Sequence, residues 1–249
     1  MTIGGRGENR HSAVSGRLGY SPRMPVSAGV HFLAPTIPLY VFEAPEPGPT
    51  ALIQAGIHGD EIAGVHALQE LLEDNYSPTH GRLLICPIMN PRAYRARQRA
   101  APDGLDLNRC FPGDAGDPAW ERRIARMFMD LVEAERPALM ATLHESQKRY
   151  DPTADRPTFG QTLVYGVQPM PEIIGRVIAR LNQRFTSEQE HWDPQYFPVA
   201  TSSTEVIVDA IGCVGICVET WMGFEERHRI EMQKAVVELL LDDVGVRKI

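Results

Sequence analysis

Three residues of this 249-residue chain have the chemical types and the spacing of a metal site: His58, Glu61 and His144. His58 directly follows an apolar run at 51–57, Glu61 comes three residues later, and His144 directly follows a second apolar run at 138–143. Catalytic zinc sites use three protein ligands and leave one position for water, and two histidines with one glutamate form such a set. Zinc held in this way lowers the pKa of a water molecule to about 7 and polarises a carbonyl group. We therefore predict one zinc ion per chain at these residues.

Chance is the alternative explanation, because a His-x-x-Glu pair occurs in many chains without any metal. Two features argue against chance. Both histidines follow apolar strands, where a purely structural histidine gains little. The arginine motif further along the chain also fits the same chemistry.

A loop motif downstream has the residue types that bind an anion. Arg109 follows Asn108, and Arg99 lies ten residues before Arg109. The planar guanidinium group binds a carboxylate through two parallel hydrogen bonds, and a second arginine near a metal can stabilise an oxyanion. The alternative is a solvated basic loop. That alternative is favoured for the neighbouring Arg92, Arg95 and Arg97, but not for Arg109, because Asn108 beside it offers both donors and an acceptor.

Glu219 follows another apolar run, at 214–218. A charged residue at the end of a buried strand is costly unless it faces a site. A carboxylate beside the attacking water can take its proton and pass it to the leaving amine. Considered alone, Glu219 would be an ordinary glutamate at a strand end.

The elements that must position these residues alternate between strand and helix. Apolar runs predict strands at 28–33, 37–43, 51–57, 83–88, 138–143, 163–166 and 214–218, with a proline-rich turn at 44–50. Helical spacing predicts helices at 62–72, 119–135, 171–185 and 224–241. This alternation predicts an α/β sandwich with a largely parallel central sheet. Ligands gather at the carboxyl ends of such strands, so the predicted zinc ligands would meet there.

Domain organisation and composition add further expectations. Residues 1–23 are polar and glycine-rich and are predicted to be a flexible leader, whereas residues 24–249 are predicted to form one domain. Hydrophobic residues make up 43% of the chain, charged residues 23%, and the net charge is -7. This balance is typical of a globular enzyme and argues against nucleic acid or an anionic membrane as a partner. The sequence gives no indication of the oligomeric state.

The cysteines and the hydropathy pattern point to a cellular location. Four cysteines are too few for a disulfide framework in a chain of this length, which favours a reducing compartment. The sequence has neither the apolar core of a signal peptide nor an apolar run near the roughly 18 residues of a membrane span. We expect a cytoplasmic protein.

Taken in order, these motifs resemble the zinc carboxypeptidase superfamily, near its murein peptide amidase and succinylglutamate desuccinylase/aspartoacylase branches. The resemblance covers about residues 50 to 240 and rests on His58-Gly59-Asp60-Glu61, Asn90-Pro91, Arg99, Asp106-Leu107-Asn108-Arg109-Cys110-Phe111, Thr142-Leu143-His144 and Val218-Glu219. It implies a three-layer sandwich with a mixed, mostly parallel central sheet. It also implies zinc on His58, Glu61 and His144, Glu219 as general base and acid, Arg99 at the oxyanion, and Asn108 and Arg109 on a substrate carboxylate.

The chain also departs from the superfamily pattern. Asp60 replaces the arginine that digestive carboxypeptidases carry between the first two ligands, which points to the amidase and acylase branches. Cys110 replaces an asparagine or small polar residue, and we expect it to be a packed thiol. A substrate-capping tyrosine is not obvious, and the candidates are Tyr150, Tyr165 and Tyr196. The short stretch after Glu219 has no room for the small β-rich domain of the aspartoacylase group, which favours a compact carboxypeptidase-like or murein-amidase-like enzyme.

The leading hypothesis is a zinc hydrolase that cleaves an amide bond next to a free carboxylate in a small peptide or peptide-like substrate. The first alternative is a deacylase of N-acyl amino acids, in which the same clamp holds a single amino acid as the leaving group. The second alternative is a non-catalytic metal- or peptide-binding protein. The complete set of ligands and base argues against this last alternative.

Overall fold

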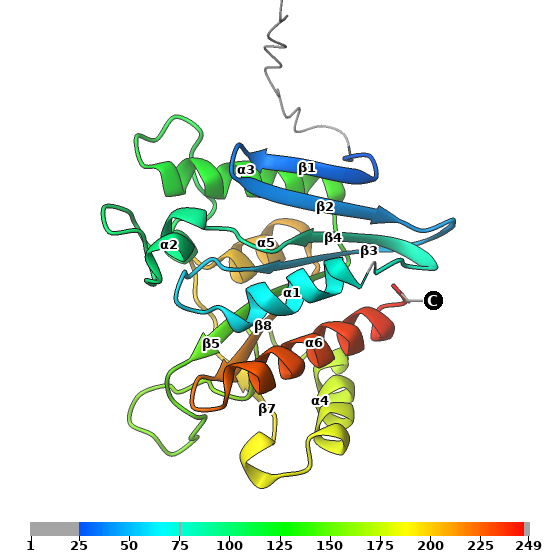
Figure 1. Cartoon of the computed structure of the whole chain (residues 1–249), viewed down its shortest axis with the longest axis vertical. Helices are drawn as coiled ribbons and strands as arrows, with labels where there is room; N and C mark the ends of the chain where they lie inside the picture. Colours follow the sequence, from blue (N-terminus) through cyan, green and yellow to red (C-terminus); the bar gives the residue numbers. More distant parts are fainter. Residues whose placement is uncertain (1–24, 75, 247–249) are drawn as a thin grey trace, which may run out of the picture.

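A mixed sheet runs through the molecule in the computed structural model, which describes residues 25–74 and 76–246 (Figure 1). Within this part of the chain the sheet has eight strands in the order β1-β2-β4-β3-β5-β8-β6-β7. The strands are β1 (Gly29–Ala34), β2 (Ile37–Glu43), β3 (Glu46–Ala55), β4 (His80–Cys86), β5 (Leu139–Ser146), β6 (Thr162–Tyr165), β7 (Asp193–Tyr196) and β8 (Val214–Trp221). The leader predicted at 1–23 lies outside the described residues.

Parallel pairing dominates the centre of the sheet, and antiparallel pairing is found toward its edges. Strands β4, β3, β5 and β8 are parallel neighbours, and β6 is parallel to β7. The antiparallel pairs are β1 with β2, β2 with β4, and β6 with β8. The predicted mixed, mostly parallel sheet is confirmed.

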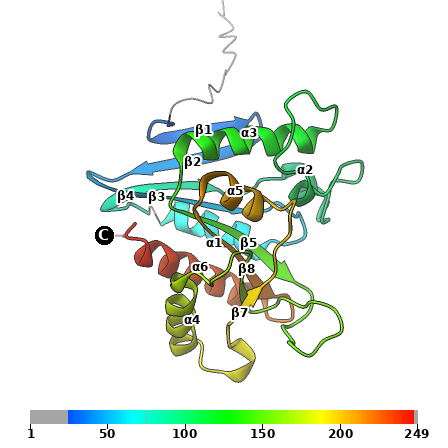
Figure 2. The same cartoon turned by 180° about the vertical axis from the view of Figure 1, so that it is seen from behind.

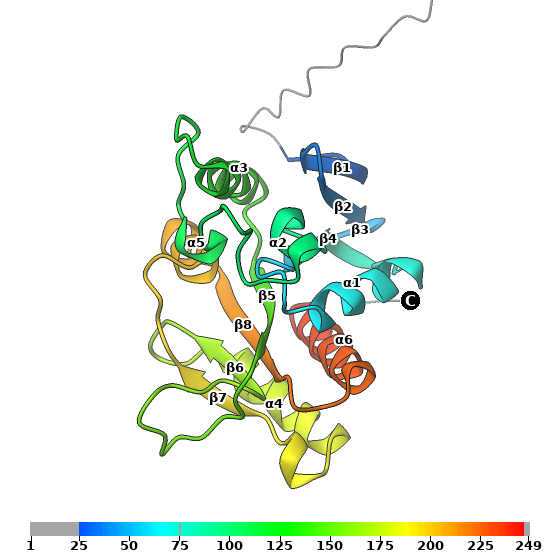
Figure 3. The ribbon, with the colours of Figure 1, turned by 60° about the vertical axis from the view of Figure 1, so that its left-hand side comes forward.

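Helices cover both faces of the sheet (Figures 2 and 3). One hydrophobic core joins α1 (Ala63–Glu73), α4 (Glu172–Arg184) and α6 (Glu226–Asp243) to one face, and a second joins α3 (Trp120–Glu135) and α5 (Ser203–Ile211) to the other. Along β3, Ala51, Ile53 and Ala55 belong to the first core, whereas Leu52 belongs to the second. A strand buried on both faces is a continuous apolar run, which is why the central strands could be predicted from the sequence.

The proline-rich turn predicted at 44–50 is wrong, because β3 begins at Glu46. Glu46 pairs with His80 of β4, and the register shifts between Glu46 and Thr50. Pairing with β5 starts only at Ala51. The two prolines within β3, Pro47 and Pro49, therefore lie where β3 has one neighbour. Proline is tolerated there because its missing N–H is not needed on the open side.

Three short elements were not predicted: α2 (Pro91–Ala96), α5 and β7. Two 3₁₀ turns, η1 (Leu107–Arg109) and η2 (Glu188–Glu190), complete the described structure. No helix in residues 25–74 and 76–246 is long and apolar enough to cross a membrane.

Candidate active site

The loop between β3 and α1 carries His58 and Glu61. Because β3 ends at Ala55 and α1 begins at Ala63, one residue later than predicted, both residues lie in the loop. Gly59 is required between them by close packing, since a Cβ atom at this position would lie 2.0 Å from the carbonyl carbon of Ala93 in α2. The Gly59 N–H also donates to the Gln98 carbonyl at 2.9 Å. The loop is therefore held against α2 at the residue between its two predicted ligands.

Asn90 and Pro91 start helix α2, which gives these two motif residues a structural role. The Asn90 side-chain oxygen accepts a hydrogen bond from the Ala93 N–H at 3.0 Å, and Pro91 occupies the first helical position. Asparagine at the N-cap and proline at the first helical position both favour a helix N-terminus. The Asn90 N–H donates to the Gly56 carbonyl at 2.9 Å, which connects α2 to the loop that carries His58.

His144 and Glu219 lie on neighbouring parallel strands. Both strands are longer than predicted, so His144 and Glu219 lie within β5 and β8 and do not follow their ends. The register places His144 directly beside Glu219. Together with the β3 loop, they meet at the carboxyl edge of the sheet, as the sequence predicts.

The three predicted ligands form one buried cluster. His58, Glu61 and His144 are all buried, and one potential ligand atom from each lies within 4.8 Å of the others. The Nδ1 atoms of His58 and His144 each lie 2.7 Å from a different oxygen of the Glu61 carboxylate. Both imidazole rings therefore point the same nitrogen at the same place.

Asp106 also belongs to the site, although no role was predicted for it from the sequence. One of its oxygens lies 3.2 Å from His58 Nε2 and also accepts the Asn108 N–H at 2.9 Å, which caps η1. The capping position before Leu107 was a usable signal, because aspartate is favoured there. A proton held on Nε2 by Asp106 leaves the lone pair of Nδ1 for a metal, the arrangement usual for histidine ligands. The donor set thus fits a zinc ion, with neutral imidazoles and one carboxylate.

The charges in the cluster interact strongly. Burial lowers the pKa of His58, but Glu61 and Asp106 outweigh this effect and raise it to about 9. Burial acts to raise the pKa of Glu61, yet the two imidazoles keep it far below its usual value. Burial lowers the pKa of His144, and Glu61 offsets only part of this effect. The cluster holds Glu61 as a carboxylate, ready for a cation.

A second layer of contacts holds the cluster from α6. The Glu145 N–H donates to Glu61 Oε2 at 3.3 Å, and the Glu145 carboxylate accepts the Ala63 N–H at 2.9 Å. Arg229 of α6 forms an ion pair with this buried carboxylate. Gln233, also of α6, donates to the His144 carbonyl at 2.8 Å. The last described helix therefore contacts the strand that carries His144.

Glu219 is partly buried and lies outside the cluster of ligand atoms, but it lines the same cavity. Burial, together with the negative charge of Glu61, raises its pKa to about 8. A carboxyl group whose pKa lies near neutrality suits a group that takes and returns a proton.

The predicted anion-binding residues lie on the segment after α2 and line the same cavity. Arg99 donates to Asp106 at 3.0 Å, and its guanidinium group lies 3.3 Å from His58 Nδ1 and 3.6 Å from Glu61. The Asn108 side-chain oxygen accepts from the Ser203 N–H at 2.9 Å, so its amide NH₂ group remains for a ligand. Arg109 is exposed, and its guanidinium group donates to the Asn108 carbonyl at 2.9 Å.

One cavity of about 280 Å³ joins all seven predicted site residues. Its wall contains His58, Glu61, Arg99, Asn108, Arg109, His144 and Glu219. Arg92, Arg95 and Arg97, which we expected in a solvated basic loop, do not line it; Arg92 and Arg95 lie in α2, and Arg97 is its C-cap. The volume is close to the lower end of the roughly 300–1,000 Å³ of small-molecule sites.

Comparison with known proteins gives matches in sequence and in structure. The sequence profile of the succinylglutamate desuccinylase/aspartoacylase catalytic domain matches residues 47–151. An N-alpha-acetyl-L-2,4-diaminobutyric acid deacetylase from Halomonas elongata is 45% identical over 94 residues, which are 37% of this chain and 27% of that protein. A succinylglutamate desuccinylase from Burkholderia thailandensis is 38% identical over 96 residues, which are 37% of this chain and 26% of that protein. The matched stretch is thus about a quarter of each relative.

Solved structures match over most of the chain. Product-bound Csd4, a cell shape determinant protein of Helicobacter pylori, has a TM-score of 0.75 at 17% identity, over 85% of this chain and 56% of that chain. A succinylglutamate desuccinylase/aspartoacylase from Rhodobacter sphaeroides has a TM-score of 0.64 at 23% identity, over 86% of this chain and 60% of that chain. These likenesses establish the fold.

The match of residues 47–151 to the succinylglutamate desuccinylase/aspartoacylase catalytic domain supports the predicted placement in the zinc carboxypeptidase superfamily. The three-layer α/β architecture with its mixed sheet agrees with this placement.

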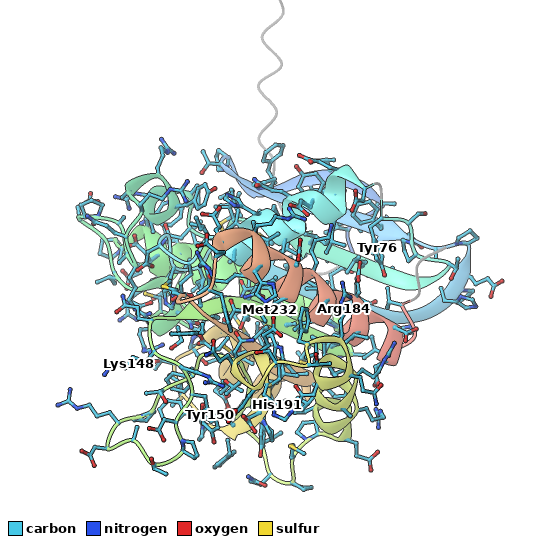
Figure 4. The ribbon with its side chains drawn as sticks, turned by 60° about the horizontal axis from the view of Figure 1, so that its bottom comes forward. Tyr76, Lys148, Tyr150, Arg184, His191 and Met232 are labelled. Atoms are coloured by element: carbon cyan, nitrogen blue, oxygen red, sulfur yellow. The ribbon has the colours of Figure 1, made fainter. Side chains whose placement is uncertain are left out.

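The structure shows the surroundings of two departures from the superfamily pattern, Cys110 and the missing capping tyrosine. Cys110 is buried, and its thiol contacts the Asp106 carbonyl at 3.3 Å, which fits the packed thiol that we expected. None of Tyr150, Tyr165 and Tyr196 is among the residues that line the cavity; Tyr150 lies on the loop between β5 and β6 (Figure 4). Phe159 and Phe197 line it instead, with ring centroids 5.0 Å apart.

Proposed function

We propose that this member of the superfamily is a zinc-dependent hydrolase that cleaves an amide bond next to a free carboxylate in a small substrate. The observation that carries the proposal is the shared cavity. A buried His-Glu-His cluster, the partly buried carboxyl group of Glu219 and two guanidinium groups line one space of about 280 Å³.

His58, Glu61 and His144 would hold the zinc ion. Bound zinc would supply a Lewis acid that polarises the substrate carbonyl and lowers the pKa of water. Glu219 takes the proton of the attacking water and later gives it to the leaving nitrogen as the C–N bond breaks. Amide and water thus become a carboxylate and an amine.

Arg99, Asn108 and Arg109 orient the substrate. The Arg99 guanidinium group lies beside Glu61 and His58, where it can donate to the oxyanion that develops on the carbonyl oxygen. The free amide NH₂ group of Asn108 and the guanidinium group of Arg109 bind the substrate carboxylate. This clamp fixes the amide bond relative to Glu219.

Two kinds of substrate share this chemistry, a peptide and an N-acyl amino acid. The sequence relatives support the second, because both are named as enzymes that remove an acyl group from an amino acid. We therefore propose N-acyl amino acid deacylation as the leading activity and carboxypeptidase activity as the alternative. A peptidase is supported by a structural neighbour, a Csd4 described as a D,L-carboxypeptidase.

The test compares N-acyl amino acids with dipeptides as substrates of the wild-type protein and of Glu219→Gln. We expect Glu219→Gln to lower kcat by about 10²–10⁴-fold, the usual contribution of a positioned acid–base group. Elemental analysis should find one zinc ion per chain in both proteins. Glu73→Gln, at an exposed position of α1, is the matched control and should keep full activity. A fully active Glu219→Gln variant would contradict the mechanism.

The non-catalytic alternative gives different results in the same experiment. A metal- or peptide-binding protein would bind zinc or ligand without turnover of either substrate class. Protein purified without chelator and found free of zinc would favour this alternative. The cytoplasmic location stays a prediction, and cell fractionation would test it.

A further inference from the structure

Glu205 is a cavity residue that the proposed mechanism does not use. It lies in the first turn of α5, after the helix cap Ser202, whose hydroxyl accepts the Glu205 N–H at 3.3 Å. Its side chain lines the same cavity as the predicted zinc ligands.

The Glu205 carboxylate is packed against protein without a partner. A Cβ atom at Gly166 would lie 1.8 Å from Glu205 Oε2, so the carboxylate rests directly on the backbone after β6. Val164, Phe197 and Val199 line the cavity as well and give this part of the wall an apolar character. Within residues 25–74 and 76–246, no hydrogen bond or ion pair reaches the Glu205 carboxylate. Burial, followed by the charge of Asp209, raises its pKa.

An acidic residue in the first turn of a helix has an ordinary explanation, which is attraction to the helix N-terminus. Other first-turn acids of this protein differ from Glu205, however. Glu172 in α4 and Glu226 in α6 are exposed, and each has a charged or ionisable partner, Arg176 and His66. Glu205 is partly buried beside apolar residues, and a carboxylate in such surroundings is stabilised when a cation pairs with it.

The first turn of α5 is tied to the predicted carboxylate clamp. Ser203, two residues before Glu205, donates through its N–H and its hydroxyl to the Asn108 side-chain oxygen, at 2.9 and 3.2 Å. The carboxylate of Glu205 therefore lies on the side of the cavity where the carboxylate-bearing half of the substrate would bind.

We propose that Glu205 binds a protonated amine on the carboxylate-bearing half of the substrate, so that the preferred leaving group is an amino acid with a cationic side chain. The inference rests on the proposed function for the position of that half. The same chemistry is present in an Nα-acyl diamino acid and in a peptide that ends in a diamino acid or lysine.

The experiment uses pairs of substrates that differ only in the terminal group of one side chain. Nα-acetyl-ornithine and Nα-acetyl-norleucine form one pair, and glycyl-ornithine and glycyl-norleucine form the other, so that the two pairs distinguish deacylase from peptidase activity. We expect the wild-type zinc-loaded protein to prefer the ornithine member in kcat/KM by at least about 30-fold, a usual effect for a desolvated charge pair. Glu205→Gln should reduce this preference to within about 3-fold. Its activity on the norleucine member should change little, which also shows that the variant is folded.

Two matched variants control the experiment. Glu172→Gln removes an exposed first-turn acid on another helix and should leave the preference unchanged. Asp60→Asn removes another carboxylate of the cavity wall, one of whose oxygens is buried without a partner in the described structure. Asp60→Asn should keep the preference.

Each contrary outcome has a distinct meaning. Hydrolysis without a preference for ornithine, a preference that survives Glu205→Gln, or a preference that Asp60→Asn removes would overturn the inference. Hydrolysis of none of the four compounds would count against the proposed function. In that case calorimetric titration with free ornithine and norleucine decides the inference, because ornithine binding that does not depend on Glu205 overturns it.

Discussion

The two sides of the cavity differ in how completely their polar groups are partnered. On the side of β3 and β5, His58 lies 2.7 Å from Glu61 and 3.2 Å from Asp106, and Glu61 is also held by His144 and the Glu145 backbone. On the side of α5, the Asn108 NH₂ group and the Glu205 carboxylate have no bond within the described chain, and Arg109 is exposed.

This difference separates two tasks. Groups that act on the reacting bond need a fixed geometry, and a network of internal bonds provides it before the substrate arrives. Groups that recognise the substrate must keep free donors and acceptors for it. Substitutions on the first side should therefore affect zinc and kcat, whereas substitutions on the second should affect KM and specificity.

The largest effect is expected for Glu61→Ala. This change removes the carboxylate that both imidazoles face, so the chain should lose its zinc and at least about 1,000-fold in kcat/KM. Elemental analysis and hydrolysis rates measure the two effects, with Glu73→Ala of α1 as control. Stoichiometric zinc in Glu61→Ala would show that the cluster is not the metal site.

An intermediate effect is expected for Asp106→Asn. Asparagine can still cap η1, but its neutral oxygen binds the His58 N–H less strongly and lowers the basicity of Nδ1. We expect zinc affinity to fall by about 10–100-fold, as is usual for the partner of a histidine ligand. Competition with a fluorescent chelator measures the affinity. The control is Asp103→Asn, because Asp103 is exposed and pairs with Arg92 only; equal affinities in the two variants would refute the role of Asp106.

The smallest effect is expected for Ser203→Ala, on the recognition side. Alanine loses the hydroxyl, which donates to Asn108 and accepts from Gln54 at 2.9 Å, but it keeps the backbone N–H bond to Asn108. KM should rise by roughly 3- to 10-fold, the equivalent of one neutral hydrogen bond, with zinc affinity unchanged. Ser187→Ala, at the cap of η2, is the control. A loss of zinc in Ser203→Ala would mean that the two sides of the cavity are not separate.

The catalytic side could largely be predicted from the sequence, because its residues lie at the ends of strong apolar patterns. His58, His144 and Glu219 follow or end runs that are buried on both faces, and the parallel topology brings those ends together. The exact strand ends could not be predicted, because β5 and β8 continue through their polar residues, which are buried among partners from other elements.

On the recognition side, Asn108 and Arg109 were predicted, but the part that contains α5 and β7 was not, because these short elements lack a strong pattern. The first turn of α5 contains Ser203, Thr204 and Glu205, and its helix has only nine residues. Strand β7 reads Asp-Pro-Gln-Tyr, which has no apolar alternation, and it forms only by pairing with β6. Glu205 faces the cavity because of this tertiary arrangement, which local sequence does not encode.

The contacts from α6 impose an order of assembly on the site. Arg229 pairs with Glu145, and Gln233 donates to the His144 carbonyl. Residues synthesised after all three predicted ligands thus bind the strand that carries His144. The convergence of the ligands requires contacts between distant parts of the chain, so we expect them not to be held together while the chain grows. We expect the nascent protein to capture zinc only after its last described helix has docked on the sheet.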